Sequence, residues 1–435
     1  MKQYAQMIHE LKTPVVMKQL NNLYGVQKGM LVAQTTRYTR LLKRHEELIG
    51  SHTEDGIRLI SAPGRAEIGG NHTDHNMGKV LTAAVNLDTV AAVTIRGDQN
   101  VNVYSEGYAP LTISLDDLAM RESELGTTAA LIRGVAAKLQ EEGLPIGGFD
   151  AVVTSTVKGG SGLSSSAAFE VMICAIFDEL YGGNRLDKKH RAKICQYAEN
   201  VYFGKPSGLL DQMASSVGGL AYIDFQDKDP QLKEVHYDFT SKGYSLVVVN
   251  TGGDHGDLTA SYTDITTEMA AVAACFGEKF LRPVQPERFY QSLPAVREEL
   301  KGQVNADRAI MRASHYFEEN HRVAEEFAAL KEDDISAFLS LIIQSGRSSF
   351  CYLQNVFASP KEQQLSLALM LAEHTLRGKG AWRVHGGGFA GTTLNFVPHK
   401  ELESFVRDMD AVFGAHSCQV LSIRPIGPAC VHLKG

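Results

Sequence analysis

KGGSGLSSSAAFEV, residues 158–171, is the stretch that decides the fold. Its glycines allow sharp backbone turns and a close approach of N–H groups to a ligand. Three serines then open an apolar segment typical of a helix, with Ser164 at the N-cap position. Because a helix N-terminus carries unpaired N–H donors and a partial positive charge, the pattern predicts a phosphate-binding loop. A capped helix after a flexible turn is the simpler alternative.

Other phosphate-binding motifs are missing from the sequence. No GxxxxGK[ST] stretch occurs, and neither the HRD nor the DFG element of protein kinases is present. The predicted phosphate loop must therefore belong to another class of nucleotide-binding protein.

Composition limits the function further. The chain has 435 residues, 44% of them hydrophobic and 21% charged, with a formal net charge of −7. This length favours two domains, and the acidic balance argues against a nucleic-acid partner. No run of eighteen apolar residues and no apolar leader is visible, so we expect no membrane partner and a cytoplasmic location. The six cysteines form no CxxC pair and are expected to be free thiols.

Patterning along the chain predicts an α+β fold. Residues 1–50 read as a helical segment packed on the body through Leu31, Tyr38, Leu41 and Leu42, with its basic residues on the solvent face. VLTAAV and TVAAVTIRG (residues 80–85 and 89–97) read as strands, and WRVHGGGFAGTTLNFV (residues 382–397) reads as strand, glycine turn and strand. Regular βαβ alternation is lacking, so we expect mixed and antiparallel sheets. The expected domains are residues 51–235 and 236–435.

A second unusual stretch is SAPGRAEIGGNHTDHNMG, residues 61–78. Its HTDH letters are reminiscent of a metal site. However, a zinc site would require a third ligand and usually a helix, whereas this stretch is a glycine-rich loop before a strand. The backbone-loop interpretation is therefore favoured over zinc.

Three stretches in order, PGR…IGxNHTDHN, GGSGLSSSAA and HGGGFAG, resemble the three motifs of GHMP kinases, a family of small-molecule kinases. The first is most similar to the galactokinase form GRVNLIGEHTDYN. GLLDQMASSVGG, RASHYFEENHRV and RPIGPA also resemble galactokinase segments. The resemblance extends from about residue 20 to residue 435.

This resemblance implies a two-domain GHMP kinase-like fold with the active site between the domains. It implies ATP-dependent phosphorylation of the anomeric hydroxyl of a monosaccharide, with Mg²⁺ as cofactor and galactose as the expected sugar. A related sugar 1-kinase is the alternative, acting on a 2-acetamido sugar, a pentose or a C6-modified galactose. A non-catalytic sugar and ATP sensor is the third reading. The expected state is a monomer or weak homo-oligomer.

The resemblance also implies site residues. Asp211 and Arg65 would lie at the reacting centre, where Asp211 either orients the hydroxyl or accepts its proton. The implied substrate-binding residues are Asn71, His72, Asp74, Gly208 and Tyr262. The implied ATP-binding residues are Gly159, Gly160, Ser161, Gly162, Leu163, Ser164, Ser165 and Ser166. The implied Mg²⁺ ligands are Ser166 and Glu199.

Three departures from the family pattern concern the sugar. Asn71 stands where galactokinases have the Glu of EHTD, which would accept a hydrogen bond from the C6 hydroxyl, and His75 replaces a Tyr. FCYLQNVFASP, residues 350–360, replaces a more charged run that resembles RDxYEVSCPELD. None of these changes affects the implied kinase residues, so they bear on which sugar is accepted.

Overall fold

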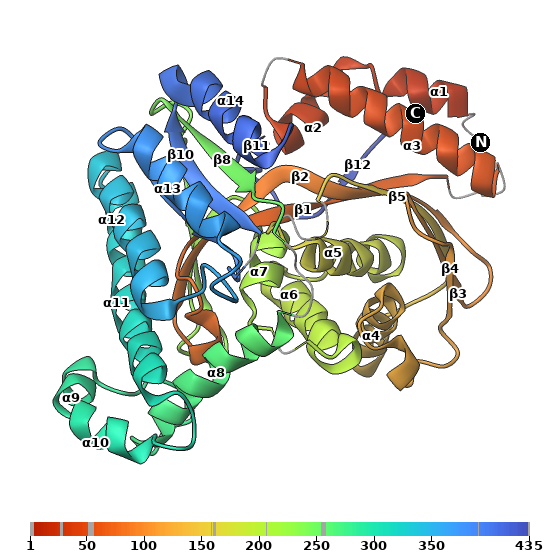
Figure 1. Cartoon of the computed structure of the whole chain (residues 1–435). Coiled ribbons are helices and arrows are strands. Elements are labelled where there is room, and N and C mark those ends of the chain that lie inside the picture. The colour runs from red at the N-terminus through yellow and green to blue at the C-terminus, as the bar shows by residue number, and fades with distance from the viewer. Residues whose placement is uncertain are drawn as a thin grey trace.

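The computed structural model describes residues 4–26, 29–50, 56–157, 159, 162–205, 207–253, 258–389 and 391–433. Helices and strands follow one another irregularly in these ranges, and the strands form two sheets (Figure 1). The α+β architecture predicted from the sequence is confirmed. In the described ranges, no helix combines the length and the apolar character needed to cross a bilayer.

The larger sheet is mixed and has eight strands in the order β12-β1-β2-β5-β3-β4, with β6 on β2 and β7 on β6. The pair β3–β5 is parallel and the other pairs are antiparallel. The bounds of its strands are β1 Arg58–Gly69, β2 Lys79–Ile95, β3 Asn100–Ser105, β4 Leu111–Ser114, β5 Phe149–Ser155, β6 Leu220–Asp224, β7 Gln231–Val235 and β12 Ala429–Val431.

The smaller sheet is antiparallel, in the order β11-β8-β10-β9. Its strands are β8 Tyr244–Asn250, β9 Ala381–His385, β10 Thr392–Pro398 and β11 Cys418–Leu421. The predicted strand, glycine turn and strand at residues 382–397 is confirmed as β9–β10. After β11 the chain crosses back, so β12 pairs with β1 in the larger sheet.

Strand β2 is a single strand, whereas the sequence indicated two separate ones. The polar residues between the two apolar runs, Asn86 and Asp88, are buried and bonded instead of forming a turn. Asn86 accepts a hydrogen bond from the backbone of Ser422 at 2.9 Å, and Asp88 is held by arginines. Long-range partners thus allow the strand to continue through two turn-favouring residues.

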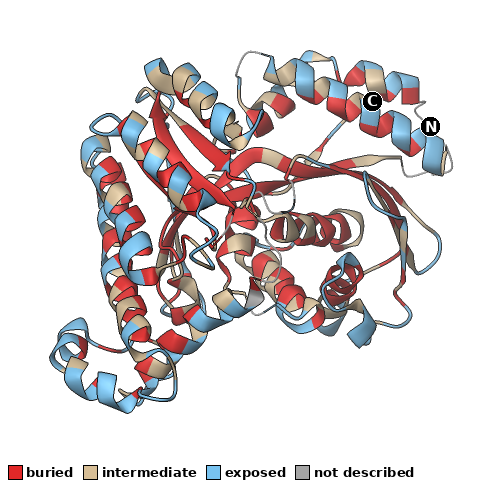
Figure 2. Cartoon of the chain, viewed as in Figure 1, coloured by how far each residue is buried: buried red, intermediate tan, exposed pale blue. Residues whose placement is uncertain are grey.

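The helices cover both faces of the larger sheet (Figure 1). Helices α5 and α7 pack against β1 and β2, while α2 and α3 lie on the opposite face (Figure 1). Their inward faces are buried and their outer faces exposed (Figure 2). The helix bounds are α1 Tyr4–Glu10, α2 Pro14–Tyr24, α3 Met30–Ile49, α4 Thr128–Glu141, α5 Ser165–Phe177, α6 Lys188–Tyr197, α7 Leu210–Val217, α8 Thr259–Ala274, α9 Pro286–Gln291, α10 Leu293–Glu299, α11 Ala306–Lys331, α12 Ile335–Ser348, α13 Gln364–Leu376 and α14 Leu402–Phe413.

The N-terminal helices are joined to the sheet by a buried charge as well as by apolar packing. Tyr38, Leu41 and Leu42 are buried as expected, and Leu31 packs at the edge of the same cluster. Arg37, however, does not lie on a solvent face as predicted. Its guanidinium contacts the fully buried carboxylate of Asp88 at 2.5 Å and also bonds the carbonyl of Thr154 at 3.1 Å.

Asp88 is shared between both ends of the chain. Arg424 contacts its carboxylate at 3.3 Å and Tyr24 donates to it at 2.6 Å. Burial alone would raise the pKa of Asp88, but the two guanidinium groups outweigh burial and lower it. The carboxylate is therefore ionised. Helix α3, through Arg37, and the segment before β12, through Arg424, are both bonded to this one buried charge.

Replacing Arg37 by Met would remove one cation from this buried carboxylate. Breaking a buried ion pair is costly because the remaining charge stays in the interior, so we expect a loss of about 3 kcal/mol in the free energy of unfolding. Urea denaturation measures this loss. Arg40→Met is the control, since Arg40 is 67% exposed on the same helix, and it should change stability by less than about 0.5 kcal/mol. Equal losses in both variants would contradict the assignment.

Candidate active site

A bidentate ion pair between Arg65 and Asp211 lies at the centre of the site. Arg65 Nε lies 2.6 Å from Asp211 Oδ1, and Arg65 Nη2 lies 2.9 Å from Oδ2. Arg65 follows a bulge in β1, between Pro63 and Arg65, and Asp211 lies in the first turn of α7. A bulge redirects side chains locally. The pair joins the first motif to the GLLDQ segment, as the sequence resemblance implied.

The phosphate loop contacts the same pair. Ser164 stands at the N-cap position of α5, but its hydroxyl makes no cap bond; it donates to Asp211 Oδ2 at 2.7 Å. The carbonyl of Gly162 accepts a hydrogen bond from Arg65. Gly162 has a φ of 71° and backs closely onto Thr392 of β10, so a side chain there would be strained and would clash. The predicted cap role of Ser164 is therefore wrong, because its oxygen has a better partner in a charged carboxylate.

Electrostatics keep Asp211 ionised. Burial opposes ionisation, yet Arg65, Lys205 and the Ser164 hydroxyl together lower the pKa of Asp211 below its ordinary value. The pKa of Arg65 is raised despite its burial, mainly by Asp211. Both members of the pair are thus charged at neutral pH.

Ser166 and Glu199 form a second contact beside the loop. The Ser166 hydroxyl donates to Glu199 Oε1 at 2.9 Å. Glu199 is buried and also accepts from Lys205 at 3.1 Å, Ser207 at 2.6 Å and Gln212 at 2.7 Å. Lys205 belongs to none of the sequence motifs and was not predicted. Its ammonium group interacts with both Glu199 and Asp211, and these carboxylates raise the pKa of Lys205. Two oxygen ligands of the implied metal site are therefore adjacent.

Three of the remaining predicted loop residues are described by the structure, and two are not. Gly159 is exposed and Leu163 is fully buried, where its carbonyl accepts from the backbone of Arg65 at 3.0 Å. Ser165 begins α5. Gly160 and Ser161, both predicted to bind ATP, lie outside the described residues.

Asp74 and Gly208 are brought together from opposite segments. A side chain at position 208 would overlap the Asp74 carboxylate, so glycine is needed there to keep Asp74 in this position. Burial, together with the nearby charge of Asp211, raises the pKa of Asp74 to about 6, although backbone N–H groups of His75 and Leu210 oppose the shift. Asp74 is thus a buried carboxylate close to Asp211, a member of the Arg65–Asp211 ion pair.

His72 and Tyr262 lie against the third motif. His72 Nε2 lies 3.0 Å from the carbonyl of Gly387, and the His72 ring stacks on Tyr262 with centroids 6.5 Å apart. Tyr262 donates to the carbonyl of Gly388 at 3.2 Å. Burial lowers the pKa of His72 to about 4. Because a carbonyl only accepts, Nε2 carries the proton of this neutral ring and Nδ1 remains as an acceptor.

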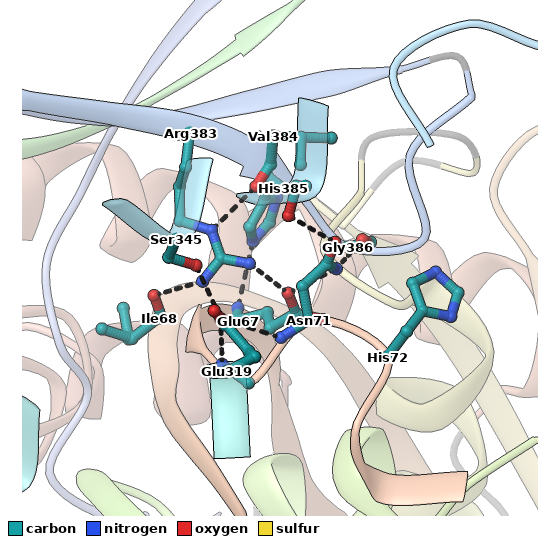
Figure 3. A network of polar contacts seen from close by, with 12 residues as sticks. Glu67, Ile68, Asn71, His72, Glu319, Ser345, Arg383, Val384, His385 and Gly386 are labelled. Carbon is teal, nitrogen blue, oxygen red and sulfur yellow. Dashed lines mark hydrogen bonds and ion pairs between the residues drawn. The ribbon is translucent and has the colours of Figure 1, made fainter. Parts of the chain in front are cut away.

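Asn71 behaves differently from the other predicted sugar contacts. It is fully buried, and its amide nitrogen donates to Glu67 Oε1 at 2.8 Å and to the carbonyl of Gly386 at 2.7 Å. Its oxygen accepts from Ser349 at 3.1 Å and Asn355 at 2.8 Å. Figure 3 shows this side chain directed into a polar network, whereas His72 points away from it. All its hydrogen-bonding positions are thus taken by protein groups, which leaves none for the expected sugar hydroxyl.

Helix α11 carries two residues, His315 and Glu319, that bond the backbone of the first motif and were not predicted from the sequence. Glu319 accepts from the backbone of Gly70 at 3.0 Å, and His315 Nε2 lies 2.9 Å from the carbonyl of Asn71. Burial would raise the pKa of Glu319, but nearby Arg322 lowers it to about 2. Both residues lie in the RASHYFEENHRV stretch, so the resemblance of that stretch was the available signal. This helix fixes the backbone of the first motif.

The comparisons with known proteins agree with this geometry. The family model described as "GHMP kinases N terminal domain" matches residues 130–219. The model described as "Galactokinase galactose-binding signature" matches residues 43–95. The first of these ranges contains the phosphate loop, Glu199 and Asp211, and the second contains Arg65, His72 and Asp74.

Solved structures show the same fold. A Lactococcus lactis galactokinase in complex with galactose has a TM-score of 0.78 at 23% identity, covering 90% of this chain and 99% of that one. A Methanococcus jannaschii mevalonate kinase has a TM-score of 0.61 at 12% identity, covering 86% of this chain and 99% of that one. The GHMP kinase-like fold expected from the sequence is confirmed.

Curated relatives show the family. The chain is 32% identical to a galactokinase of Streptomyces coelicolor over 377 residues, which are 86% of this chain and 92% of that one. It is 31% identical to a galactokinase of Glaesserella parasuis, over 80% of this chain and 87% of that one. With this identity over most of both lengths, the chain belongs to the galactokinase family.

Proposed function

We propose that this protein transfers the γ-phosphoryl group of ATP to the anomeric hydroxyl of galactose. The observation that carries the proposal is the ionised Asp211 carboxylate, held by Arg65 next to the N-terminus of α5. A hydroxyl bound to this carboxylate would face phosphate bound at the helix N-terminus. Family membership supports both substrates.

The phosphates of ATP would bind the loop at residues 159–166 and the N-terminus of α5. The helix presents free N–H groups and a partial positive charge there, and Arg65 adds a full charge. Phosphoryl transfer depends chiefly on positioning and on neutralising charge, so these groups suit the reaction.

Ser166 and Glu199 fit Mg²⁺ by their chemistry. Mg²⁺ prefers oxygen ligands and is commonly held by one or two carboxylates together with substrate phosphates and water. Here a hydroxyl and a carboxylate lie 2.9 Å apart at the start of α5. Bound there, the ion would neutralise charge on the phosphates. Lys205 would supply a further positive charge to the same region.

Asp211 would orient the sugar hydroxyl more than deprotonate it. Its lowered pKa makes it a weak base, and the loose transition state of phosphoryl transfer needs little proton removal before the bond forms. A carboxylate offers about four acceptor positions, and Arg65 and Ser164 fill three here. Among the described residues nothing fills the remaining position, which could accept a hydrogen bond from the sugar hydroxyl.

The sugar would bind between two parts of the chain. We propose that residues 51–235 form an N-terminal domain that carries His72, Asp74, Gly208 and the phosphate loop, and that residues 236–435 form a C-terminal domain that carries Tyr262 and the third motif. Residues 1–50 would be a helical segment on the N-terminal domain. His72, Asp74 and Tyr262 then supply the polar contacts to sugar hydroxyls, and Gly208 leaves room for them.

A sugar panel tests the proposal. ADP release would be measured with galactose, 6-deoxygalactose, a 2-acetamido sugar and a pentose, each with ATP and Mg²⁺. Turnover with galactose as the best substrate is expected. A preference for another sugar would assign a related sugar 1-kinase, and ATP binding without turnover on any sugar would assign the sensor function.

Asp211→Asn should lower kcat by roughly 10²-fold, because the amide keeps the shape but loses the charge that orients the hydroxyl. The KM values for sugar and ATP should change far less. Steady-state kinetics measure both. Asp227→Asn, a surface change, is the matched control and should be silent. A turnover within about threefold of wild type in Asp211→Asn would overturn this role.

Gly208→Ala should weaken sugar use while sparing ATP. The added methyl group would displace the Asp74 carboxylate, so we expect the sugar kcat/KM to fall by about 10-fold or more, the cost of one lost charge-assisted hydrogen bond. Calorimetry of ATP binding should give an unchanged Kd. Gly97→Ala is the control, because Gly97, like Gly208, has no positive φ and a methyl group there meets nothing within 4 Å. An unchanged sugar KM in Gly208→Ala would show that Asp74 does not contact the sugar.

The raised pKa of Asp74 predicts a pH dependence. Below its pKa of about 6 the carboxyl is protonated and accepts hydrogen bonds poorly, so the sugar kcat/KM should fall as the pH drops through 6. The stability effect has the opposite sign: the native state binds the proton more tightly than the unfolded chain, so this group destabilises the fold as the pH rises from about 4 to 6. Asp74→Asn should flatten both profiles in this range. Unchanged profiles would contradict the assignment.

A further inference from the structure

Glu67 and Asn71 form a buried carboxylate–amide pair at the start of the loop between β1 and β2. This loop, residues 70–78, carries the predicted sugar contacts His72 and Asp74 and is called the sugar loop below. The Asn71 amide donates to Glu67 Oε1 at 2.8 Å, and both side chains are shielded from solvent (Figure 3). Glu67 lies on β1 and Asn71 follows the end of that strand. The contact therefore spans the turn at Gly69 and Gly70 that starts the loop.

On the Glu67 side the pair meets a buried arginine. Arg383 on β9 is fully buried, and its Nη2 lies 2.8 Å from Glu67 Oε1. The same guanidinium donates to the carbonyls of Ile68 at 2.7 Å and Val384 at 3.0 Å. Glu67 is the carboxylate bonded to this guanidinium; burial raises the pKa of Glu67 to about 7, although Arg383 and Arg65 oppose the shift, so any negative charge that the pair carries is held toward β9.

On the Asn71 side the pair reaches the third motif. The amide donates to the carbonyl of Gly386, and Asn355 donates both to Asn71 at 2.8 Å and to the carbonyl of Gly387 at 3.1 Å. The next residue, His72, also contacts the Gly387 carbonyl. The position of His72 thus depends on Asn71 and its partners.

The letters of the first motif show an exchange at these two positions. Aligned on Arg65, the galactokinase form GRVNLIGEHTDYN has Asn where this chain has Glu67, and Glu where it has Asn71. One carboxylate and one amide are present in both forms, at swapped positions. Since the two side chains contact each other here, a change at one position alone would leave either two facing carboxylates or two facing amides.

We propose that Glu67 and Asn71 are an exchanged pair that acts as one positioning unit, holding the sugar loop against the third motif and moving its negative charge away from position 71 toward Arg383. This inference rests on the proposed sugar-kinase function. The pair places His72 and acts on the sugar through it. The sugar side of the loop then presents His72 and Asp74, without a carboxylate from position 71.

Single substitutions test the unit first. Asn71→Glu would place a carboxylate against Glu67 and the Gly386 carbonyl, and Glu67→Asn would remove the carboxylate that contacts Arg383. Each should lower the melting temperature by about 5 °C or more. Each should also reduce the sugar kcat/KM by about 10-fold or more, with the ATP KM changed by less than about threefold.

The reciprocal double variant, Glu67→Asn with Asn71→Glu, is the decisive protein. It restores one carboxylate and one amide, so its melting temperature and its sugar kcat/KM should both exceed the values expected from adding the two single effects. Recovery of the sugar kcat/KM to within about threefold of wild type is expected. Strict additivity in either measurement would overturn the proposal, because recovery of stability alone is the result that a purely structural pair would give.

Glu326→Gln is the matched control. Glu326 is also a fully buried glutamate of this region, packed against Gly69, but neither of its carboxylate oxygens has a hydrogen-bond partner among the residues that the structure describes. It should show neither the loss in sugar kcat/KM nor any rescue. If the wild type phosphorylates no sugar, the proposed function fails. The pair is then still tested by comparing the single and double variants in galactose calorimetry and in melting temperature. Non-additive effects in both measurements support the pair, and additive effects in either one overturn it.

Discussion

The contact between Arg65 and Asp211 is the constraint on which the site depends. It joins β1 to α7 at 2.6 and 2.9 Å, and the Gly162 carbonyl and the Ser164 hydroxyl complete it from the phosphate loop. A buried ion pair gains little net stability, because desolvation offsets attraction, but its geometry is exacting. Three segments far apart in sequence are therefore held in one arrangement, and the Asp211 carboxylate is kept ionised by the same bonds.

Other buried carboxylates of the protein are also paired with arginines. Asp88 is paired with Arg37 and Arg424, and Glu67 with Arg383, all in buried positions. Each pair connects elements that apolar packing alone would hold with less directional precision, since hydrophobic contacts are non-directional. The N-terminal helices, the returning C-terminal residues and the sugar loop are each fixed in this way. The polar core thus specifies position where the apolar clusters supply most of the stability.

Local patterns predicted the elements, and long-range partners decided the details. Helix α5 after the glycine-rich stretch and the strand pair β9–β10 were predictable because glycine conformational freedom and apolar periodicity act within a few residues. The sequence did not predict that Ser164 would bond Asp211 instead of capping α5, because that partner lies 47 positions away. Arg37, expected in solvent, is buried by a carboxylate 51 positions away. Residue type alone does not reveal such partners.

Two departures from the family pattern, treated separately in the sequence, are physically one. Asn71 lies in the first motif, and Asn355 lies in the divergent stretch at residues 350–360, yet Asn355 donates to the Asn71 oxygen at 2.8 Å. The amide oxygen at position 71 needs such a donor in a buried site, and its amide nitrogen needs the acceptors that Glu67 and Gly386 provide. A buried amide must satisfy both ends at once, so a change at position 71 imposes demands on both sides of the loop. The groups behind His72 are therefore bonded as one network, and a substitution at position 71 has to be matched by its partners on both sides.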